Sequence, residues 1–166
     1  AVLNITQDHI DWHGSFDNYI AAKKRIFAHP ETVRVLNRED PIVMGFAEEG
    51  ASMCTFGGDA PSRVHDWGLD HFDGIQWLVY NEDESVALTK RKVLSGFVEQ
   101  RLMPREALLI RGRHNAMNAL AALALTVSAG LPLAPALKAL SVYRGEPHRV
   151  QFVMTVDGVD YIDDSK

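Results

Sequence analysis

One segment, residues 115–129, constrains the fold of this chain more than any other. It is rich in alanine and leucine, which favour helix, and the helix that it predicts is apolar on nearly every face. A helix without a polar side is usually buried, so the rest of the chain must form layers that cover it. Gly130 and Pro132 end this helix, and a second helix follows it from near Pro135 to near Tyr143.

Strand-like runs precede the buried helix and supply a sheet for it to pack on. They lie at residues 2–5, 33–36, 52–56 and 75–80, with further short candidates around Leu102 and at 108–111. A helix is predicted at 16–28 with Ser15 as its N-cap. Residues 6–14 are predicted to form a polar loop and residues 57–74 to be irregular. The structure of residues 42–47 is ambiguous from the sequence. This alternation predicts an α/β fold in which the later strands form a small antiparallel layer.

The character of the chain changes at residues 145–147, Gly-Glu-Pro, which break the second helix. Beyond them, residues 150–156 and 159–162 alternate around Asp157-Gly158, a strong signal for a two-residue β-hairpin. We therefore expect one unit at residues 1–145 and the start of another at 146–166.

Composition excludes several classes of protein. The 166 residues are 46% hydrophobic with a formal net charge of −5, which is typical of a globular domain and unfavourable for nucleic-acid binding. No apolar run approaches the roughly 20 residues that a membrane helix needs. The single cysteine, Cys54, fits a reducing compartment. The chain starts in a strand-like run without Met and stops just after another, so we expect both ends to be cut from a longer protein.

Carboxylates and imidazoles are concentrated directly after the first strand, at Asp8, His9, Asp11 and His13. The ends of strands are where open α/β sheets bind ligands, and these groups suit Mg²⁺, Mn²⁺ or Zn²⁺. The alternative is a solvated loop held by an Asp–His hydrogen bond.

Lys23 falls within the apolar stripe of the predicted helix at 16–28. The stripe consists of Phe16, Tyr19, Ile20, Ile26 and Phe27. An ionised lysine is costly to bury unless it is paired or chemically changed, and a lysine with a lowered pKa can act as a nucleophile or be modified. The alternative is that its stem carries the ammonium group to the surface.

Three further groups of polar residues are candidates for contact with a nucleotide. Asn115 and Asn118 share a face at the start of the long helix, although Asn115 would also serve simply as an N-cap. Arg149 follows the expected boundary and could hold a phosphate, and Asp164 and Lys166 follow the last strand. The chain contains no Gly-x-x-x-x-Gly-Lys-Ser/Thr motif, so we expect it to be inactive by itself.

Taken in order, these motifs resemble those of the Mur ligase family over the whole chain. The matching residues are Asn4-x-x-x-Asp8-His9-x-Asp11, Tyr19-x-Ala21-Ala22-Lys23, Gly112-x-His114-Asn115-x-x-Asn118-Ala119, Pro147-His148-Arg149 and Asp164-Ser165-Lys166. The resemblance implies part of a mononucleotide-binding, P-loop-type, mostly parallel sheet with flanking helices and a small antiparallel layer. Residues 1–145 would be the later part of the family's central ATP-binding domain, and 146–166 the first hairpin of its C-terminal domain.

The resemblance also implies catalytic and metal-binding roles. His9 would be a ligand to Mg²⁺. Lys23 would be carbamylated, which turns a cation into a carboxylate-like oxygen donor and would explain a lysine in an apolar stripe. His9, Lys23 and Lys166 would form the catalytic set.

Nucleotide binding is implied for the remaining residues. Asn115 and Asn118 would contact ATP from the central domain. Arg149 and Asp164, with Lys166, would close onto it from the C-terminal domain.

The implied activity is that of a bacterial, cytoplasmic ligase dependent on ATP and Mg²⁺, which makes peptidoglycan precursors through an acyl phosphate. Residues 145–149 and 162–166 favour the member of the family whose substrates are UDP-N-acetylmuramoyl-L-alanine and D-glutamate. The family's phosphate-binding loop, a metal-ligating glutamate, the domain that holds the UDP sugar and most of the C-terminal domain would belong to missing parts of the parent chain.

Other functions stay open at this point. The chain could come from another Mur ligase or from folylpolyglutamate synthase. In a different class, it could be a metallohydrolase in which His9 and His13 bind Zn²⁺ without a nucleotide, or a non-catalytic module.

Overall fold

The computed structural model describes residues 1–83, 96–149 and 151–165. Its body is a five-stranded sheet in the order β1-β2-β3-β4-β5, formed by β1 (Arg34–Asn37), β2 (Met53–Phe56), β3 (Trp67–Phe72), β4 (Ile75–Asp83) and β5 (Phe97–Pro104). Neighbours from β1 to β3 are parallel, and those from β3 to β5 are antiparallel. The predicted α/β class is confirmed, and the antiparallel strands extend the parallel ones in a single sheet.

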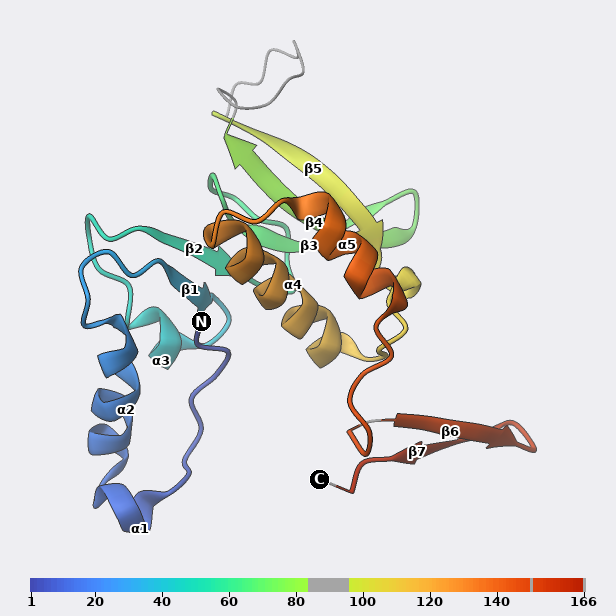
Figure 1. Cartoon of the computed structure of the whole chain (residues 1–166), viewed down its shortest axis with the longest axis horizontal. Helices are drawn as coiled ribbons and strands as arrows, with labels where there is room; N and C mark the ends of the chain where they lie inside the picture. Colours follow the sequence, from blue (N-terminus) through green and yellow to red (C-terminus); the bar gives the residue numbers. More distant parts are fainter. Residues whose placement is uncertain (84–95, 150, 166) are drawn as a thin grey trace.

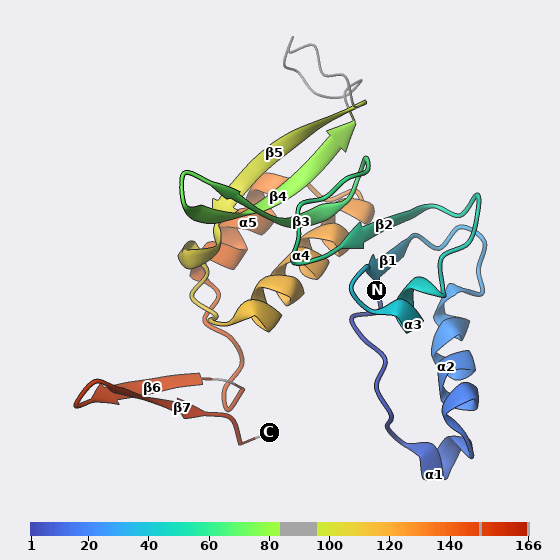
Figure 2. The ribbon, with the colours of Figure 1, turned by 180° about the vertical axis from the view of Figure 1, so that it is seen from behind.

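Helices cover both faces of β1. Alternate residues of a strand point to opposite faces: Val35 belongs to the core cluster that contains α4 (Arg113–Ser128), whereas Leu36 packs with α2 (Phe16–Lys24) and α3 (Pro41–Met44). α5 (Leu133–Val142) lies against α4 on the same side of the sheet (Figures 1 and 2). Val2, in the first predicted strand, makes an isolated parallel bridge to Leu36.

The central prediction, a buried helix at 115–129, is confirmed by α4. Its fully buried residues include Ala116, Leu120, Leu123 and Ala124, which share a cluster with residues of every strand of the sheet. The second predicted helix, near Pro135 to near Tyr143, is confirmed by α5 (Leu133–Val142).

Three parts of the sequence prediction are wrong. The stretch expected to be irregular contains β3, which pairs with β4 across the turn at Asp73-Gly74, where both residues have positive φ. Residues 108–111 form no strand: β5 is followed by the 3₁₀ turn η2 (Arg105–Ala107), and residues 108–112 are an irregular connection to α4. The expected polar loop at 6–14 contains the short helix α1 (Ile10–His13), and the ambiguous segment at 42–47 begins within α3, which Asp40 caps.

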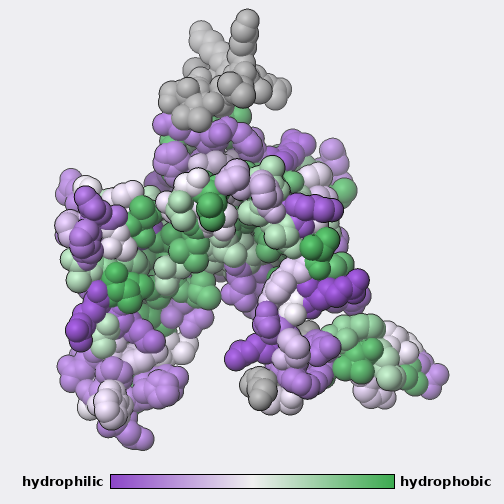
Figure 3. Space-filling view, in the orientation of Figure 1, coloured by the Kyte–Doolittle hydropathy of each residue, from purple (hydrophilic) through white to green (hydrophobic). Residues whose placement is uncertain are grey.

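The predicted C-terminal hairpin is confirmed as β6 (Gln151–Val156) and β7 (Val159–Asp163). Asp157 and Gly158 both have positive φ, as a type I′ turn requires. The hairpin projects away from the sheet (Figure 1), and its apolar side chains are exposed on both strands. In the space-filling view, apolar residues cover the hairpin and much of the central face, while the surface around α1 and α2 is largely hydrophilic (Figure 3). Among the described residues, every helix is too short or too polar to cross a bilayer.

Candidate functional site

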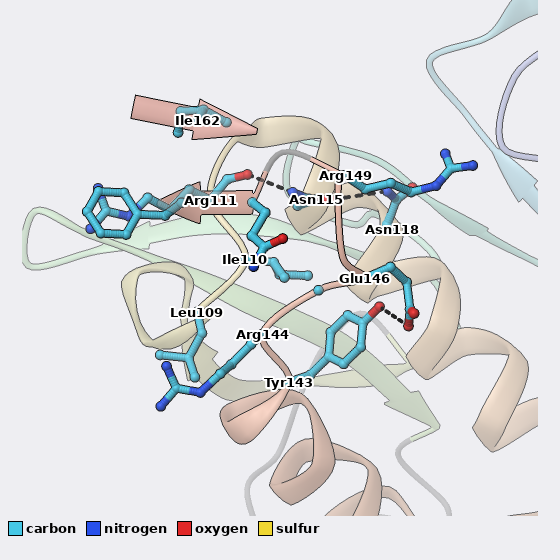
Figure 4. A pocket seen from close by; sticks show the side chains of 13 residues that line it. Leu109, Ile110, Arg111, Asn115, Asn118, Tyr143, Arg144, Glu146, Arg149 and Ile162 are labelled. Atoms are coloured by element: carbon cyan, nitrogen blue, oxygen red, sulfur yellow. Dashed lines mark hydrogen bonds between the residues drawn. The ribbon is translucent and has the colours of Figure 1, made fainter. Parts of the chain in front are cut away.

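A cleft of about 540 Å³ lies where the first turn of α4, the segment after α5 and the hairpin meet (Figure 4). Side chains from three parts of the chain line it: Leu109, Ile110, Arg111, Asn115 and Asn118 on and before α4, Tyr143, Arg144, Glu146 and Arg149 after α5, and Gln151, Phe152 and Ile162 on the hairpin. Three residues predicted to bind a nucleotide, Asn115, Asn118 and Arg149, are therefore together in one cleft.

The two asparagines form a hydrogen-bonded pair on one face of α4. The side-chain amide of Asn115 donates to the carbonyl oxygen of Arg111 at 2.8 Å, and that of Asn118 donates to Oδ1 of Asn115 at 3.4 Å. Asn115 is half-buried and Asn118 is exposed. Asn115 is thus not the N-cap of α4, a position that Gly112 occupies, and the pair presents amide groups to the cleft.

Positive charge outweighs negative charge around the cleft. Three guanidinium groups, those of Arg111, Arg144 and Arg149, line it beside one carboxylate, that of Glu146. The Tyr143 hydroxyl donates to Glu146 Oε1 at 3.0 Å, and this hydrogen bond raises the pKa of Tyr143. Guanidinium and amide donors together suit an anionic ligand with hydrogen-bonding rings, such as a nucleotide.

Arg111 also ties the body to the hairpin. Its guanidinium lies 3.5 Å from the carboxylate of Asp160 and 5.4 Å from the ring centroid of Phe152. At the base of the hairpin, His148 Nδ1 lies 2.7 Å from Asp163 Oδ2, and this hydrogen bond lowers the pKa of Asp163. The contacts of Arg111 therefore hold the hairpin beside the cleft, and the contact of His148 closes the base of the hairpin itself.

The last two predicted nucleotide contacts stand apart from the cleft lining or cannot be placed. Asp164 follows β7, is exposed and is not among the described residues that line the cleft. Lys166 lies outside the described residues.

His9 and Lys23 belong to a separate region, which we call the arm (residues 6–24). His9 is the N-cap of α1 with a φ of 53° and is 70% exposed, and its Nε2 lies 3.2 Å from Asp8 Oδ2. Lys23 is exposed, with its Nζ 5.2 Å from the centroid of the Tyr19 ring. No hydrogen bond or ion pair joins His9 to Lys23 within the described part of the chain.

Lys23 lies on the predicted face of α2, but the expectation that it is buried there is wrong. It follows Tyr19 by four residues within the α-helix, and the 3₁₀ turn η1 (Arg25–Phe27) begins only after it. Tyr19 and Phe27 are buried as expected, whereas Ile26 is 50% exposed. Lys23 therefore reaches solvent along its stem.

A complete metal site is not formed by the described residues. No group of three or more His, Cys, Asp or Glu side chains in residues 1–83, 96–149 and 151–165 could hold an ion. The ring of His13 instead packs edge-on against Tyr19, with 5.3 Å between ring centroids. The structure therefore does not support a zinc site formed by His9 and His13. A Mg²⁺ site would need ligands besides the described residues.

Among the lining residues of the cleft that sequence reasoning missed are Arg111, Tyr143 and Arg144. Arg111 directly precedes Gly112, the N-cap of α4, and Tyr143 is the C-cap of α5, three residues before Glu146. The sequence shows that these residues lie next to helix ends. It does not show that they meet in one cleft, because that depends on how α4 and α5 pack against each other.

Comparison with known proteins places this geometry in context. A family model described as the Mur ligase middle domain matches residues 1–126. The chain is 51% identical to the UDP-N-acetylmuramoylalanine–D-glutamate ligase of Burkholderia multivorans and 52% identical to that of Burkholderia vietnamiensis. Each match covers 100% of this chain and 36% of the relative, so the chain spans about a third of the length of these proteins.

Solved structures with the same fold include two other ligases. The UDP-N-acetylmuramate–alanine ligase MurC of Thermotoga maritima matches with a TM-score of 0.64 and 25% identity, over 98% of this chain and 33% of that one. MurF of Acinetobacter baumannii matches with a TM-score of 0.61 and 22% identity, over 98% of this chain and 32% of that one.

Proposed function

The chain belongs to the Mur ligase family, since the family's middle-domain model matches most of it, and from this premise we propose that it is part of an ATP-dependent ligase that joins D-glutamate to UDP-N-acetylmuramoylalanine in peptidoglycan synthesis. The observation that carries the proposal is identity above 50% along the whole chain to two relatives named for that activity. The protein would act in the bacterial cytoplasm. Residues 1–145 would be the later part of its central domain, and 146–166 the first hairpin of its C-terminal domain.

The cleft is the proposed nucleotide site. Asn115 and Asn118 offer amide donors and acceptors for the base and ribose, and Arg149 offers a bidentate cation for phosphate oxygens. When bound, ATP supplies the phosphoryl group that activates the substrate carboxyl. The excess of guanidinium groups draws the anionic nucleotide into the cleft and keeps it oriented between body and hairpin.

Asp164 and Lys166 would complete this site from the hairpin side. Both follow β7, whose end is held by the contact between His148 and Asp163. That position would allow a cation and a carboxylate to close onto the nucleotide when the hairpin moves with the rest of its domain.

The arm is the proposed partner of the cleft. His9 and a carbamylated Lys23 would contribute ligands to a Mg²⁺ site that residues outside the described set complete. The exposure of both side chains supports this role, because carbon dioxide can reach the Lys23 amine and a metal can reach His9. We also propose that the 166-residue chain alone is inactive, since its sequence has no phosphate-binding loop motif.

Phosphate release by the full-length protein tests the proposed activity. With ATP, Mg²⁺ and UDP-N-acetylmuramoyl-L-alanine, D-glutamate should support release, and L-glutamate, L-alanine and L-lysine should not. Turnover that required a folate and L-glutamate would instead identify a folylpolyglutamate synthase. Stoichiometric zinc that survived dialysis would favour the metallohydrolase.

A further inference from the structure

One ion pair joins the loop after β1 to the first residue of α4. The guanidinium of Arg113 donates to Oε1 of Glu39, a contact between residues 74 positions apart in the chain. The same oxygen accepts the backbone N–H of Gly58, which follows β2, at 2.9 Å. A single carboxylate oxygen therefore links three segments at the carboxyl ends of the parallel strands β1 and β2.

The close approach of these groups depends on glycine at position 58. A Cβ atom on Gly58 would lie 2.3 Å from Nη2 and 2.8 Å from Cζ of Arg113. Only the end of a flexible side chain would have to move, so Gly58→Ala should fold but displace the guanidinium. The hydrogen bond from Arg113 also lowers the pKa of Glu39.

This pair acts on α4 from the side opposite the cleft. Residues two positions apart on a helix do not face each other, so Arg113 points to the sheet edge while Asn115 points to the cleft. The N-cap of α4 is Gly112, with a φ of 96° and no side-chain hydrogen bond to the helix. The first turn is thus held by the bond from Asn115 to Arg111 on one side and by Arg113, Glu39 and Gly58 on the other.

We propose that Glu39 is a positioning residue that acts through Arg113 to fix the first turn of α4, and with it the amides of Asn115 and Asn118. The inference rests on the proposed nucleotide site, since it explains how that site keeps its shape. Glu39 itself is not among the described residues that line the cleft.

Binding of the non-hydrolysable analogue adenylyl imidodiphosphate to the full-length protein tests this role. Glu39→Gln and Gly58→Ala should each raise its Kd about fivefold, the upper range for an exposed ion pair. The double variant should bind like either single one, because both changes break the same link. Turnover at saturating ATP should stay within about twofold of the unaltered protein, since no reacting group is removed.

Glu48→Gln is the matched control. Glu48 also pairs with an arginine, Arg34, but Arg34 begins β1, and this ion pair is separate from the contacts among Glu39, Gly58 and Arg113. It should leave the Kd unchanged. A Kd that rose equally in Glu48→Gln would show a general loss of stability and overturn the positioning role.

Asn118→Ala separates the inference from the function on which it rests. If Asn118→Ala weakens binding but Glu39→Gln and Gly58→Ala do not, the positioning role is wrong and the nucleotide site stands. If Asn118→Ala also binds normally, the cleft is not the nucleotide site and both proposals fall.

Discussion

The cleft and the arm carry the two halves of the proposed site, and they are held in different ways. The cleft is built on α4, whose inner face is fully buried against the sheet. In the arm, α1 has no buried residue and α2 has only Tyr19. The cleft is therefore backed by a core, whereas the exposed arm offers His9 and Lys23 without enough other metal ligands among the described residues.

The largest expected effect tests whether these regions are independent. Leu120→Ala should lower the free energy of unfolding by about 3 kcal/mol, since it empties a fully buried position on α4. Burial raises the pKa of the Cys54 thiol in the same cluster, so thiol-reagent labelling of the native chain should be slow and should accelerate in this variant.

Tyr19→Ala provides the comparison from the arm. It removes a buried side chain from the other cluster and should open the arm locally without exposing Cys54. Equal acceleration of Cys54 labelling in Tyr19→Ala and Leu120→Ala would mean that the two regions unfold as one unit.

Lys23→Ala should have the next largest effect, on catalysis rather than on folding. Turnover by the full-length protein should fall about 100-fold, because a group that stabilises charge on the transferring phosphoryl is lost. Short carboxylic acids should restore part of the activity by replacing the carbamate. Lys24→Ala, the adjacent exposed lysine, should be nearly neutral. Activity equal to that of the unaltered protein would remove Lys23 from the proposed chemistry.

The smallest expected effect concerns how the stability contributed by the Glu39–Arg113 ion pair depends on pH. Arg113 lowers the pKa of Glu39 in the folded chain below the value of about 4.3 expected when unfolded. Such a group contributes stability above its unfolded pKa, and the contribution is lost as the pH falls through the folded pKa. Glu39→Gln should therefore cost about 0.5 kcal/mol at pH 7 and less at about pH 3, below the unfolded pKa. Urea unfolding at both pH values measures this difference, and a cost that was equally large at low pH would contradict the ion pair.

Local signals explain which parts of the fold could be predicted from the sequence. The helix at α4 and the hairpin at Asp157-Gly158 are each specified by adjacent residues, and both are confirmed. β3 was missed although Asp73-Gly74 carries the same turn signal as Asp157-Gly158. Its run holds Gly68, Asp70 and His71, and its stability as a strand comes from pairing on both sides with β2 and β4.

The residues of the candidate site differ in the same way: some could be predicted from local sequence and others depend on packing. Asn115 and Asn118 could be paired from their spacing alone, because helix geometry fixes the shared face. Glu39 and Arg113 could not, because their contact depends on the packing of α4 against the ends of two strands. The helix face on which Lys23 lies could be predicted, but its exposure could not, because exposure depends on how α2 packs against the rest of the chain.

The central claim is that the cleft binds the nucleotide while the arm serves catalysis. It is tested most directly by the affinity of two variants of the full-length protein for adenylyl imidodiphosphate. Asn118→Ala should raise the Kd about tenfold, the effect of one lost hydrogen bond to a ligand. Lys23→Ala, measured without Mg²⁺, should leave it within about twofold. An unchanged Kd in Asn118→Ala, or an equal rise in both variants, would contradict the account.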